Sequence, residues 1–169
     1  KWDYAGFSKR TGITRQDYNQ ELVTVINQIS AAIQKSTLRG GANWIVVSPE
    51  VASIFNNLEY FHVSDASPEE TKFSLGIEKI GSLGGRYTVY VDSYAPANTI
   101  LMGHKGDSIL HAGLIYAPYQ ALMLMPKMYN YNDGKSVHHV MSRYAIKTVN
   151  NKFYGKILVD KIPTYVTGT

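Results

Sequence analysis

The stretch ANWIVVSPE, residues 42–50, predicts a buried strand followed directly by the start of a helix. The first six residues are an apolar run that is too short for a buried helix and rich in β-branched side chains, which predicts a central strand. Ser48 and Pro49 suit the N-cap and the first helical position, and Glu50 suits the positive helix end. We expect the buried face of this helix to consist of Val51, Ile54, Phe55 and Leu58.

A second helix precedes this stretch. Thr14 and Asp17 have the spacing of a helix N-terminal cap. Apolar residues then recur at helical spacing, which predicts a helix lying on a sheet or on another helix. We expect residues 39–41 (RGG) to end it, with Gly supplying the left-handed residue. Residues 1–13 are interpreted as an irregular lead-in. The apolar stripe is formed by Leu22, Ile26, Ile29 and Ile33.

After the second helix, residues 59–79 are polar with little periodicity, and we interpret them as a long functional or mobile loop. Residues 81–85 (GSLGG) interrupt the regular structure. Residues 86–92 (RYTVYVD) alternate apolar and polar side chains, which is typical of a half-buried strand. Residues 99–102 predict a further short apolar strand.

The C-terminal third predicts strands and turns. Two apolar runs, at residues 112–116 and 121–125, are separated by Pro118, and residues 132–135 (NDGK) form a turn signal. Two longer strand-like runs, 137–149 and 153–162, are joined by residues 150–152 (NNK), which predicts a tight hairpin. The fold class is therefore α+β, with a mixed sheet, flanking helices and a long C-terminal β-hairpin.

The composition excludes several classes of protein and of binding site. The 169 residues carry a formal net charge of +4, from 17 basic and 13 acidic side chains spread along the chain, and include no Cys. The absence of Cys excludes a disulfide scaffold and a thiolate metal site. No apolar run approaches the roughly 20 residues of a membrane-spanning helix, so we expect no membrane partner. Charge this dispersed does not favour a nucleic-acid module, for which residues 39–41 and nearby lysines would be the candidate.

No motif indicates an active site. Gly134-Lys135-Ser136 ends like a phosphate loop, but position 129 is Tyr where the motif needs Gly. A small hydrolase using His104, Asp107 and His111 is an alternative, since these residues lie within eight positions. A metal there would need further ligands that the sequence does not nominate. We therefore expect no enzyme activity, no metal and no cofactor.

The tyrosines indicate more about function than the histidines and acidic residues do. Tyr gives large amphipathic contact area at low entropic cost, which suits protein–protein interfaces. Tyrosines at the margin of an ordinary core are the alternative interpretation. From the residues alone, the chain is a binding or assembly domain without a visible active site. The tyrosines concerned are Tyr87, Tyr90, Tyr94, Tyr116, Tyr119, Tyr129, Tyr131 and Tyr144.

Several segments in series resemble the C-terminal half of tailed-bacteriophage major capsid proteins, nearest to the T-even-like myovirus type. The resemblance runs from about residue 20 to residue 162, and its most specific strings are GGRYTVYVDSYA and AGLIYAPY. The family's N-terminal arm, extended loop and spine helix have no counterpart before residue 14, which indicates a fragment. The matching segments are 41–49 (GANWIVVSP), 83–95 (LGGRYTVYVDSYA), 99–106 (TILMGHKG), 112–119 (AGLIYAPY) and 142–145 (SRYA).

This resemblance implies a shell subunit that self-assembles into hexamers and pentamers around packaged DNA, in the virion and, during assembly, in the host cytoplasm. It implies an axial domain over residues 14–126, with the 59–79 loop directed to the symmetry axis, and a linker and peripheral strands over 127–169. Scaffold or decoration proteins are possible partners. An encapsulin-like bacterial compartment shell is the alternative. Candidate inter-subunit contacts are Tyr60, Asp65, Glu69, Lys72, Arg86, Tyr119, Tyr129, Tyr131 and Arg143.

Overall fold

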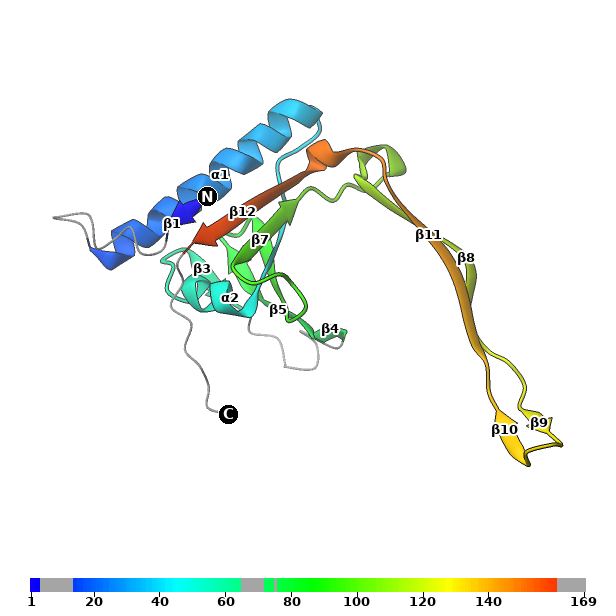
Figure 1. Cartoon of the computed structure of the whole chain (residues 1–169). Helices are drawn as coiled ribbons and strands as arrows, with labels where there is room; N and C mark the ends of the chain where they lie inside the picture. Colours follow the sequence, from blue (N-terminus) through cyan, green and yellow to red (C-terminus); the bar gives the residue numbers. More distant parts are fainter. Residues whose placement is uncertain (4–13, 65–71, 75, 161–169) are drawn as a thin grey trace, which may run out of the picture.

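The computed structural model describes residues 1–3, 14–64, 72–74 and 76–160. They form a body, in which two helices cover a mixed sheet, and a long two-stranded arm that projects from it (Figure 1). The sheet has eight strands, in the order β1-β12-β7-β2-β6-β5-β3, with β4 also paired to β5. Its strands are β1 (Trp2–Asp3), β2 (Trp44–Val47), β3 (Phe61–Val63), β4 (Lys72–Ser74), β5 (Ile77–Leu83), β6 (Tyr87–Asp92), β7 (Thr99–Gly103) and β12 (Tyr154–Asp160).

The strand of residues 44–47 is central, as predicted. β2 pairs in parallel with β6 and antiparallel with β7, so both of its edges are hydrogen-bonded. One face of the sheet carries the core, because Ile45 and Val47 are fully buried while the intervening Val46 is half-buried. Leu101 and Leu158, on the other face, remain 39% and 38% exposed. The sheet is thus packed on one side.

Helix α1 (Arg15–Thr37) begins with the predicted cap. The Asp17 amide donates to the Thr14 hydroxyl, and the Thr14 amide donates to the Asp17 carboxylate, both at 3.1 Å. The predicted stripe lies against the sheet, with Leu22 and Ile26 fully buried. The prediction for its end was wrong, because Leu38 and not a glycine adopts the left-handed conformation, with φ 54°.

Helix α2 (Pro49–Phe55) also begins and packs as predicted, since its Val51, Ile54 and Phe55 are buried in the same core as α1. Ser48 occupies the N-cap position, but its side chain makes no capping hydrogen bond. The Ser48 hydroxyl is instead buried and finds no hydrogen-bond partner among the residues that the structure describes. Ser48 therefore marks the helix start through its backbone conformation.

The long loop predicted over residues 59–79 is wrong where the structure describes it. Residues 61–63 and 72–74 are strands that pair with β5, and β5 itself runs through the glycine-rich segment to Leu83. Position 81 of β5 requires glycine, because a β-carbon there would lie 2.2 Å from the His62 carbonyl oxygen. The turn is confined to residues 84–86, and its Gly84 and Gly85 both have positive φ.

The arm consists of β8 (Leu114–Leu124) and β11 (Val140–Thr148), and it ends in the smaller hairpin of β9 (Met128–Asn130) and β10 (Lys135–Val137). The two apolar runs predicted on either side of Pro118 are one strand. Proline is compatible with this strand because a two-stranded ribbon has free edges, and the register shifts beside Pro118, where β11 steps from Arg143 to Tyr144. The turn predicted at residues 132–135 is confirmed, with Gly134 at φ 63°.

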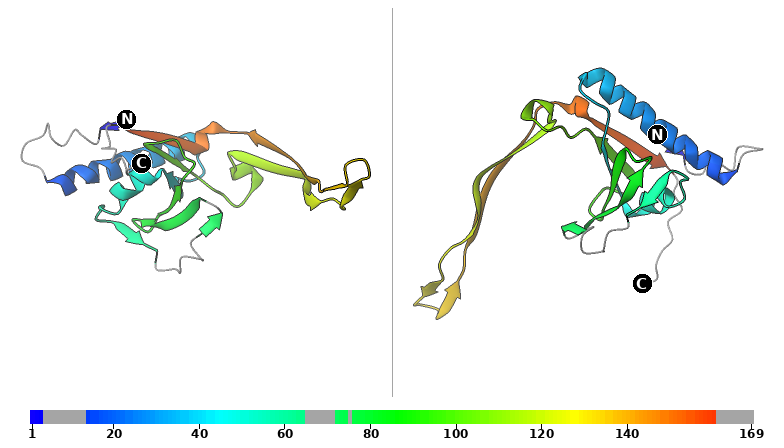
Figure 2. Two further views of the ribbon diagram at one scale, coloured as in Figure 1. Left: turned by 60° about the horizontal axis from the view of Figure 1, so that its bottom comes forward. Right: turned by 180° about the vertical axis from the view of Figure 1, so that it is seen from behind.

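A long hairpin is present, but the pairing predicted for it was wrong. β11 pairs with β8, and β12 returns to the main sheet between β7 and β1. The Asn150 side chain accepts a hydrogen bond from the Lys152 amide, which starts the 3₁₀ turn η3 (Asn151–Phe153) in place of a hairpin turn. Two views show the arm and the body separating at this turn (Figure 2).

Candidate assembly surface

The arm has no core of its own. Both β8 and β11 belong to a two-stranded sheet, and no further strand pairs with either of them in the described part of the chain. Nine of the 11 residues of β8 and eight of the nine residues of β11 are exposed. The ribbon projects away from the body in every view (Figures 1 and 2). An isolated two-stranded ribbon of this kind is marginally stable in water. Its surface is therefore the first candidate for contact with another molecule.

One face of the arm is apolar. Side chains of paired residues share a face in an antiparallel ribbon, so Tyr116 lies beside Ile146, and Leu124 lies beside Val140. These side chains are 56–67% exposed. Tyr144 belongs to the same face, because it lies two residues before Ile146 on β11. We call Tyr116, Leu124, Val140, Tyr144 and Ile146 the apolar face.

The opposite face is mixed. Ile115 pairs with Lys147, and Gln120 pairs with Arg143. The Gln120 side-chain amide lies 3.2 Å from the Met123 sulfur, which places a polar group among apolar ones. The arm is thus amphipathic, and its two faces are suited to different surroundings.

Four of the predicted contact residues lie on the arm. Tyr119 and Arg143 belong to β8 and β11, Tyr129 to β9, and Tyr131 to the turn at the tip. Tyr119, Tyr129 and Tyr131 are 84%, 63% and 97% exposed. The Lys127 ammonium lies 4.8 Å from the centre of the Tyr129 ring, within the range of a cation–π contact. These residues extend the exposed surface from the ribbon to its tip.

The other predicted contact residues lie on the body or cannot be placed. Tyr60 is 56% exposed just before β3, and Arg86 is exposed in the turn between β5 and β6. The Arg86 guanidinium lies 5.5 Å from the centre of the Tyr87 ring. Lys72 begins β4, which pairs with β5. Asp65 and Glu69 lie outside the described residues.

Tyr87 is a correction to the predicted tyrosine surface. It is only 3% exposed and belongs to the core. Its hydroxyl donates to the Asn27 side-chain oxygen on α1 at 2.9 Å. The alternation along β6 places Tyr87 on the same side as Val89, and that face is the covered one. For this residue the interpretation as an ordinary core tyrosine was the right one.

The sequence interpretation missed three members of the apolar face: Leu124, Val140 and Ile146. They were assigned to apolar strand runs, and apolar runs are usually buried. The available signal was the flanking composition, because tyrosines known for amphipathic contacts, Tyr116 and Tyr144, alternate with them in the same strands. Only the pairing of β8 with β11 brings these residues to one surface.

The histidines of the alternative hydrolase site contact different partners. His104 Nδ1 lies 2.8 Å from the Gly41 carbonyl oxygen, and its ring stacks on Phe153. His111 Nε2 lies 3.3 Å from the Arg39 guanidinium. Within the described ranges, no group of three or more His, Asp or Glu side chains is arranged to hold a metal ion. The geometry gives the hydrolase interpretation no support.

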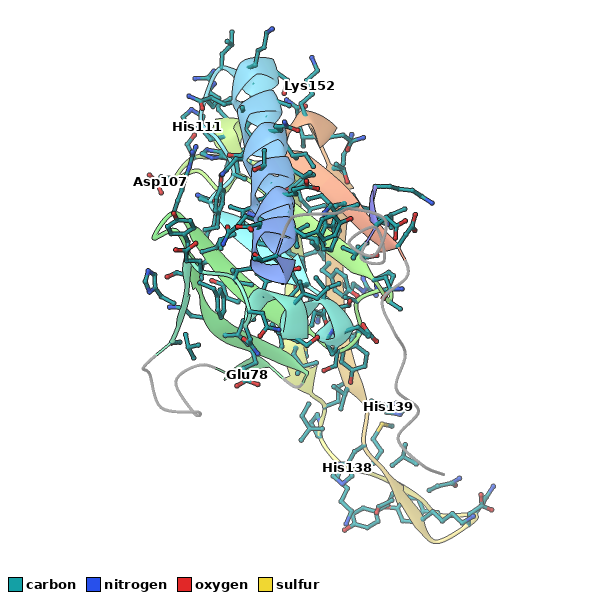
Figure 3. All side chains as sticks on the ribbon, turned by 90° about the vertical axis from the view of Figure 1, so that its left-hand side faces the viewer. Glu78, Asp107, His111, His138, His139 and Lys152 are labelled. Atoms are coloured by element: carbon teal, nitrogen blue, oxygen red, sulfur yellow. The ribbon has the colours of Figure 1, made fainter. Side chains whose placement is uncertain are left out.

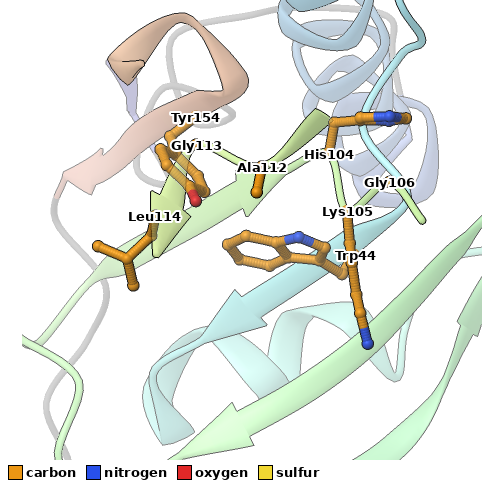
Figure 4. Close-up of a pocket in the computed structure, with 8 residues that line it drawn as sticks. All are labelled: Trp44, His104, Lys105, Gly106, Ala112, Gly113, Leu114 and Tyr154. Atoms are coloured by element: carbon orange, nitrogen blue, oxygen red, sulfur yellow. The ribbon is translucent and has the colours of Figure 1, made fainter. Parts of the chain in front are cut away.

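A small pocket lies where the arm joins the body (Figure 4). Its volume is about 200 Å³, and Trp44 and Tyr154 form its walls with ring centres 6.0 Å apart. Burial raises the pKa of the Tyr154 hydroxyl, and a hydrogen bond with the Leu114 backbone partly opposes that shift. The pocket is lined by Trp44, His104, Lys105, Gly106, Ala112, Gly113, Leu114 and Tyr154.

This architecture, a one-sided mixed sheet under two helices with a projecting ribbon, is the fold of phage-type capsid proteins. It matches the structure of a virus-like particle from Pyrococcus furiosus with a TM-score of 0.50 and 9% sequence identity, over 87% of this chain and 54% of that one. The chain belongs to the major capsid protein Gp23 family, whose model matches residues 1–168.

The related sequences are phage proteins. The chain is 35% identical to the major capsid protein of Enterobacteria phage T4 over 131 residues, which are 74% of this chain and 24% of the relative. It is 33% identical over 106 residues to that of Salmonella phage ViI, covering 60% of this chain and 24% of the relative. The chain thus spans about a quarter of the length of these curated relatives. The family resemblance is confirmed, and the bacterial compartment shell is not favoured.

No helix in the described ranges has both the length and the apolar character required to cross a membrane.

Proposed function

We propose that this chain is part of a subunit that builds an icosahedral phage capsid, in which copies associate as hexamers and pentamers around packaged DNA. The observation that supports this proposal is the apolar face of the arm, whose large side chains are more than half exposed. Its role is mechanical and requires no catalytic step. Membership of a major capsid protein family supports a location in the virion capsid, and we propose the host cytoplasm as the place of assembly.

The exposure of the apolar face of the arm to water is unfavourable. Exposed contiguous apolar patches mark interaction sites in soluble proteins, and long unpaired strand edges invite pairing with another chain. Tyr116 and Tyr144 add rigid aromatic area of the kind enriched in protein interfaces. A surface of this composition is stabilised when a neighbouring protein covers it. In a shell, that neighbour is another subunit.

We propose that the body is the axial domain, near the centre of the capsomer, and that the arm is peripheral, along its edge. The pairing of β8 with β11 favours a boundary at the root of the arm over one at residue 126, because β12 lies in the main sheet. In this arrangement the predicted contacts divide between two interfaces. Tyr60, Asp65, Glu69, Lys72 and Arg86 would serve the axial interface, and Tyr119, Tyr129, Tyr131 and Arg143 the peripheral one.

We also propose packaged DNA and scaffold or decoration proteins as partners. The net charge of +4 would let an inner surface tolerate packed phosphates without sequence-specific binding. Scaffold or decoration proteins would bind the outer or inner shell surface. These contacts require no motif beyond the exposed polar residues of the body.

Negative-stain electron microscopy of the full-length protein tests the proposal. We expect the wild type to form shells, tubes or six-fold rings, and the Y116S/Y144S double variant to form markedly fewer of them. The variant K156S, at an exposed position of β12 outside the arm, is the control and should assemble like the wild type. Uniform monomers of the wild type at assembly concentration, or full assembly of Y116S/Y144S, would count against the proposal.

A further inference from the structure

Two loops are joined by hydrogen bonds at the C-terminal end of α1. We call residues 38–41 and 104–111 the corner. His104 contacts the Gly41 carbonyl, and the Asn43 side chain bonds the Lys105 backbone twice, at 2.7 and 2.8 Å. A β-carbon at Gly106 would lie 2.3 Å from that of His111, so the second loop is folded tightly on itself. The corner is a built surface held by hydrogen bonds.

This corner exposes three large aliphatic side chains. Leu38 is 86% exposed, Ile109 75% and Leu110 79%. Leu38 also has the left-handed conformation, with φ 54°, which is unfavourable for a side chain with a β-carbon. The contact between Arg39 and His111 joins the two loops that carry these residues. Exposed aliphatic side chains on two hydrogen-bonded loops, one of them at a strained backbone position, are typical of a contact surface.

The surroundings of the corner are basic. Lys35 lies in the last turn of α1, Arg39 follows that helix, and Lys105 is exposed. Figure 3 shows His111 and Lys152 on either side of the same helix end, with Asp107 nearby. Asp107 is the acidic residue of the second loop. The described side chains therefore give this end of the body an excess of positive charge.

The described side chains at the opposite end of the body include several carboxylates, and we call this end the acidic end. Asp17 lies in the first turn of α1. The Gln20 side-chain amide, near the same helix end, donates to the Glu59 carboxylate at 3.5 Å. β2 begins next to Asn43, beside the corner, and runs away from it. Glu50, at the start of α2, follows the far end of β2 and therefore lies away from the corner. Tyr60, 56% exposed, adds apolar area there. About 25 Å of helix separates the two ends, from the rise of 1.5 Å per residue over residues 20–37.

We propose that the corner of one copy docks on the acidic end of the next copy, with Leu38, Ile109 and Leu110 buried and Arg39 near Glu59. This inference rests on the proposed function and identifies a partner surface on the body that is separate from the arm. The two surfaces differ and lie at opposite ends of one helix, so the contact is head-to-tail. Head-to-tail contacts close into rings when the rotation allows it, as a capsomer requires. Opposite charges set the register of such a contact.

Charge reversal in the full-length protein tests the contact. We expect R39E alone and E59R alone each to reduce ring and shell formation at least tenfold at moderate salt, measured by sedimentation and negative-stain microscopy. A mixture of the two variants should restore six-membered rings, because each R39E corner then meets an E59R end and each native corner meets a native end; a five-membered ring cannot alternate, so pentamers are not expected from the mixture. The double variant R39E/E59R should assemble by itself. K156E, with the same charge change on β12, is the matched control and should assemble normally.

The outcomes separate this inference from the proposed function. If the wild type assembles and R39E and E59R assemble equally well, the head-to-tail contact is wrong while the capsid role stands. If both variants fail and neither the mixture nor the double variant restores assembly, the pairing of these two ends is wrong. Loss of assembly in K156E equal to that in R39E would attribute the effect to net charge and overturn the inference. A wild type that never assembles contradicts the proposed function itself.

Discussion

The rings of Tyr116 and Tyr144 lie 5.5 Å apart across the arm, tilted by 41°, although the two residues are 58% and 59% exposed. They are diagonal neighbours, because Tyr116 pairs with Ile146 and Tyr144 with Pro118. Aromatic pairs of this geometry contribute about 0.5–1.5 kcal/mol beyond their burial. The chain thus holds a preformed aromatic surface in water, and that surface needs only a partner to become buried.

Amides of the arm should exchange hydrogen faster than those of the main sheet while the protein is unassembled. Within the described ranges, β8 and β11 have neither a third strand nor a packed face, whereas β7 and β12 are paired on both sides and carry core residues. Local opening costs less free energy where few apolar contacts must break. Hydrogen exchange measured by mass spectrometry on peptides from 114–148 and 154–160 checks this. Equal protection of both segments would contradict it, and assembly should slow exchange in the arm.

The two helix N-caps should respond oppositely to alanine. T14A removes a hydroxyl that accepts the Asp17 amide, so we expect it to lower the free energy of unfolding by about 1 kcal/mol. S48A removes a buried hydroxyl with no described partner, so we expect no change or a gain of up to about 1 kcal/mol. Urea unfolding of both variants compares them directly. A larger loss in S48A than in T14A would show that Ser48 has a partner.

The cap of α1 should make stability depend on acid. Hydrogen bonds from the Thr14 side chain and backbone lower the pKa of the Asp17 carboxyl below its ordinary value. A lowered pKa stabilises the fold above the ordinary value, and that contribution is lost as the pH falls through the folded pKa. The wild type should therefore be more stable than D17N at pH 7, and this difference should shrink in the acid range below about pH 4. Urea unfolding at both pH values measures it, and a constant difference would contradict the assignment.

Replacing Leu38 by glycine should stabilise the fold and weaken assembly. The left-handed conformation of Leu38 costs about 1–2 kcal/mol because the residue has a β-carbon, and glycine avoids this cost. Glycine loses more backbone entropy on folding, which offsets about 0.5–1 kcal/mol of the stabilisation. We expect L38G to raise the free energy of unfolding by about 0.5–1 kcal/mol. The matched control A31G, at an exposed position inside α1, should lower it by about 1 kcal/mol. A loss of stability in L38G would mean that the exposed side chain supports the fold.

Much of the body was predictable because its signals are local. The cap at Thr14, the stripe through Leu22 and Ile26, and the alternation along β6 depend on residues within one or two turns or one strand. The segment 42–50 likewise specified both the central strand and the helix that follows it. The resemblance to capsid proteins added the family, which no local pattern contained.

The tertiary structure alone decided which strands pair and which surface remains open. Residues 150–152 have the composition of a tight turn, but Ile157 and Val159 are buried on the main sheet, and that burial outweighs a local hairpin with β11. β11 consequently pairs with β8, across the tip of the arm, and Tyr144 reaches Tyr116. A sequence specifies turns and periodicity through neighbouring residues, whereas strand pairing is a competition between distant segments for the same core. The apolar face of the arm is a product of that competition.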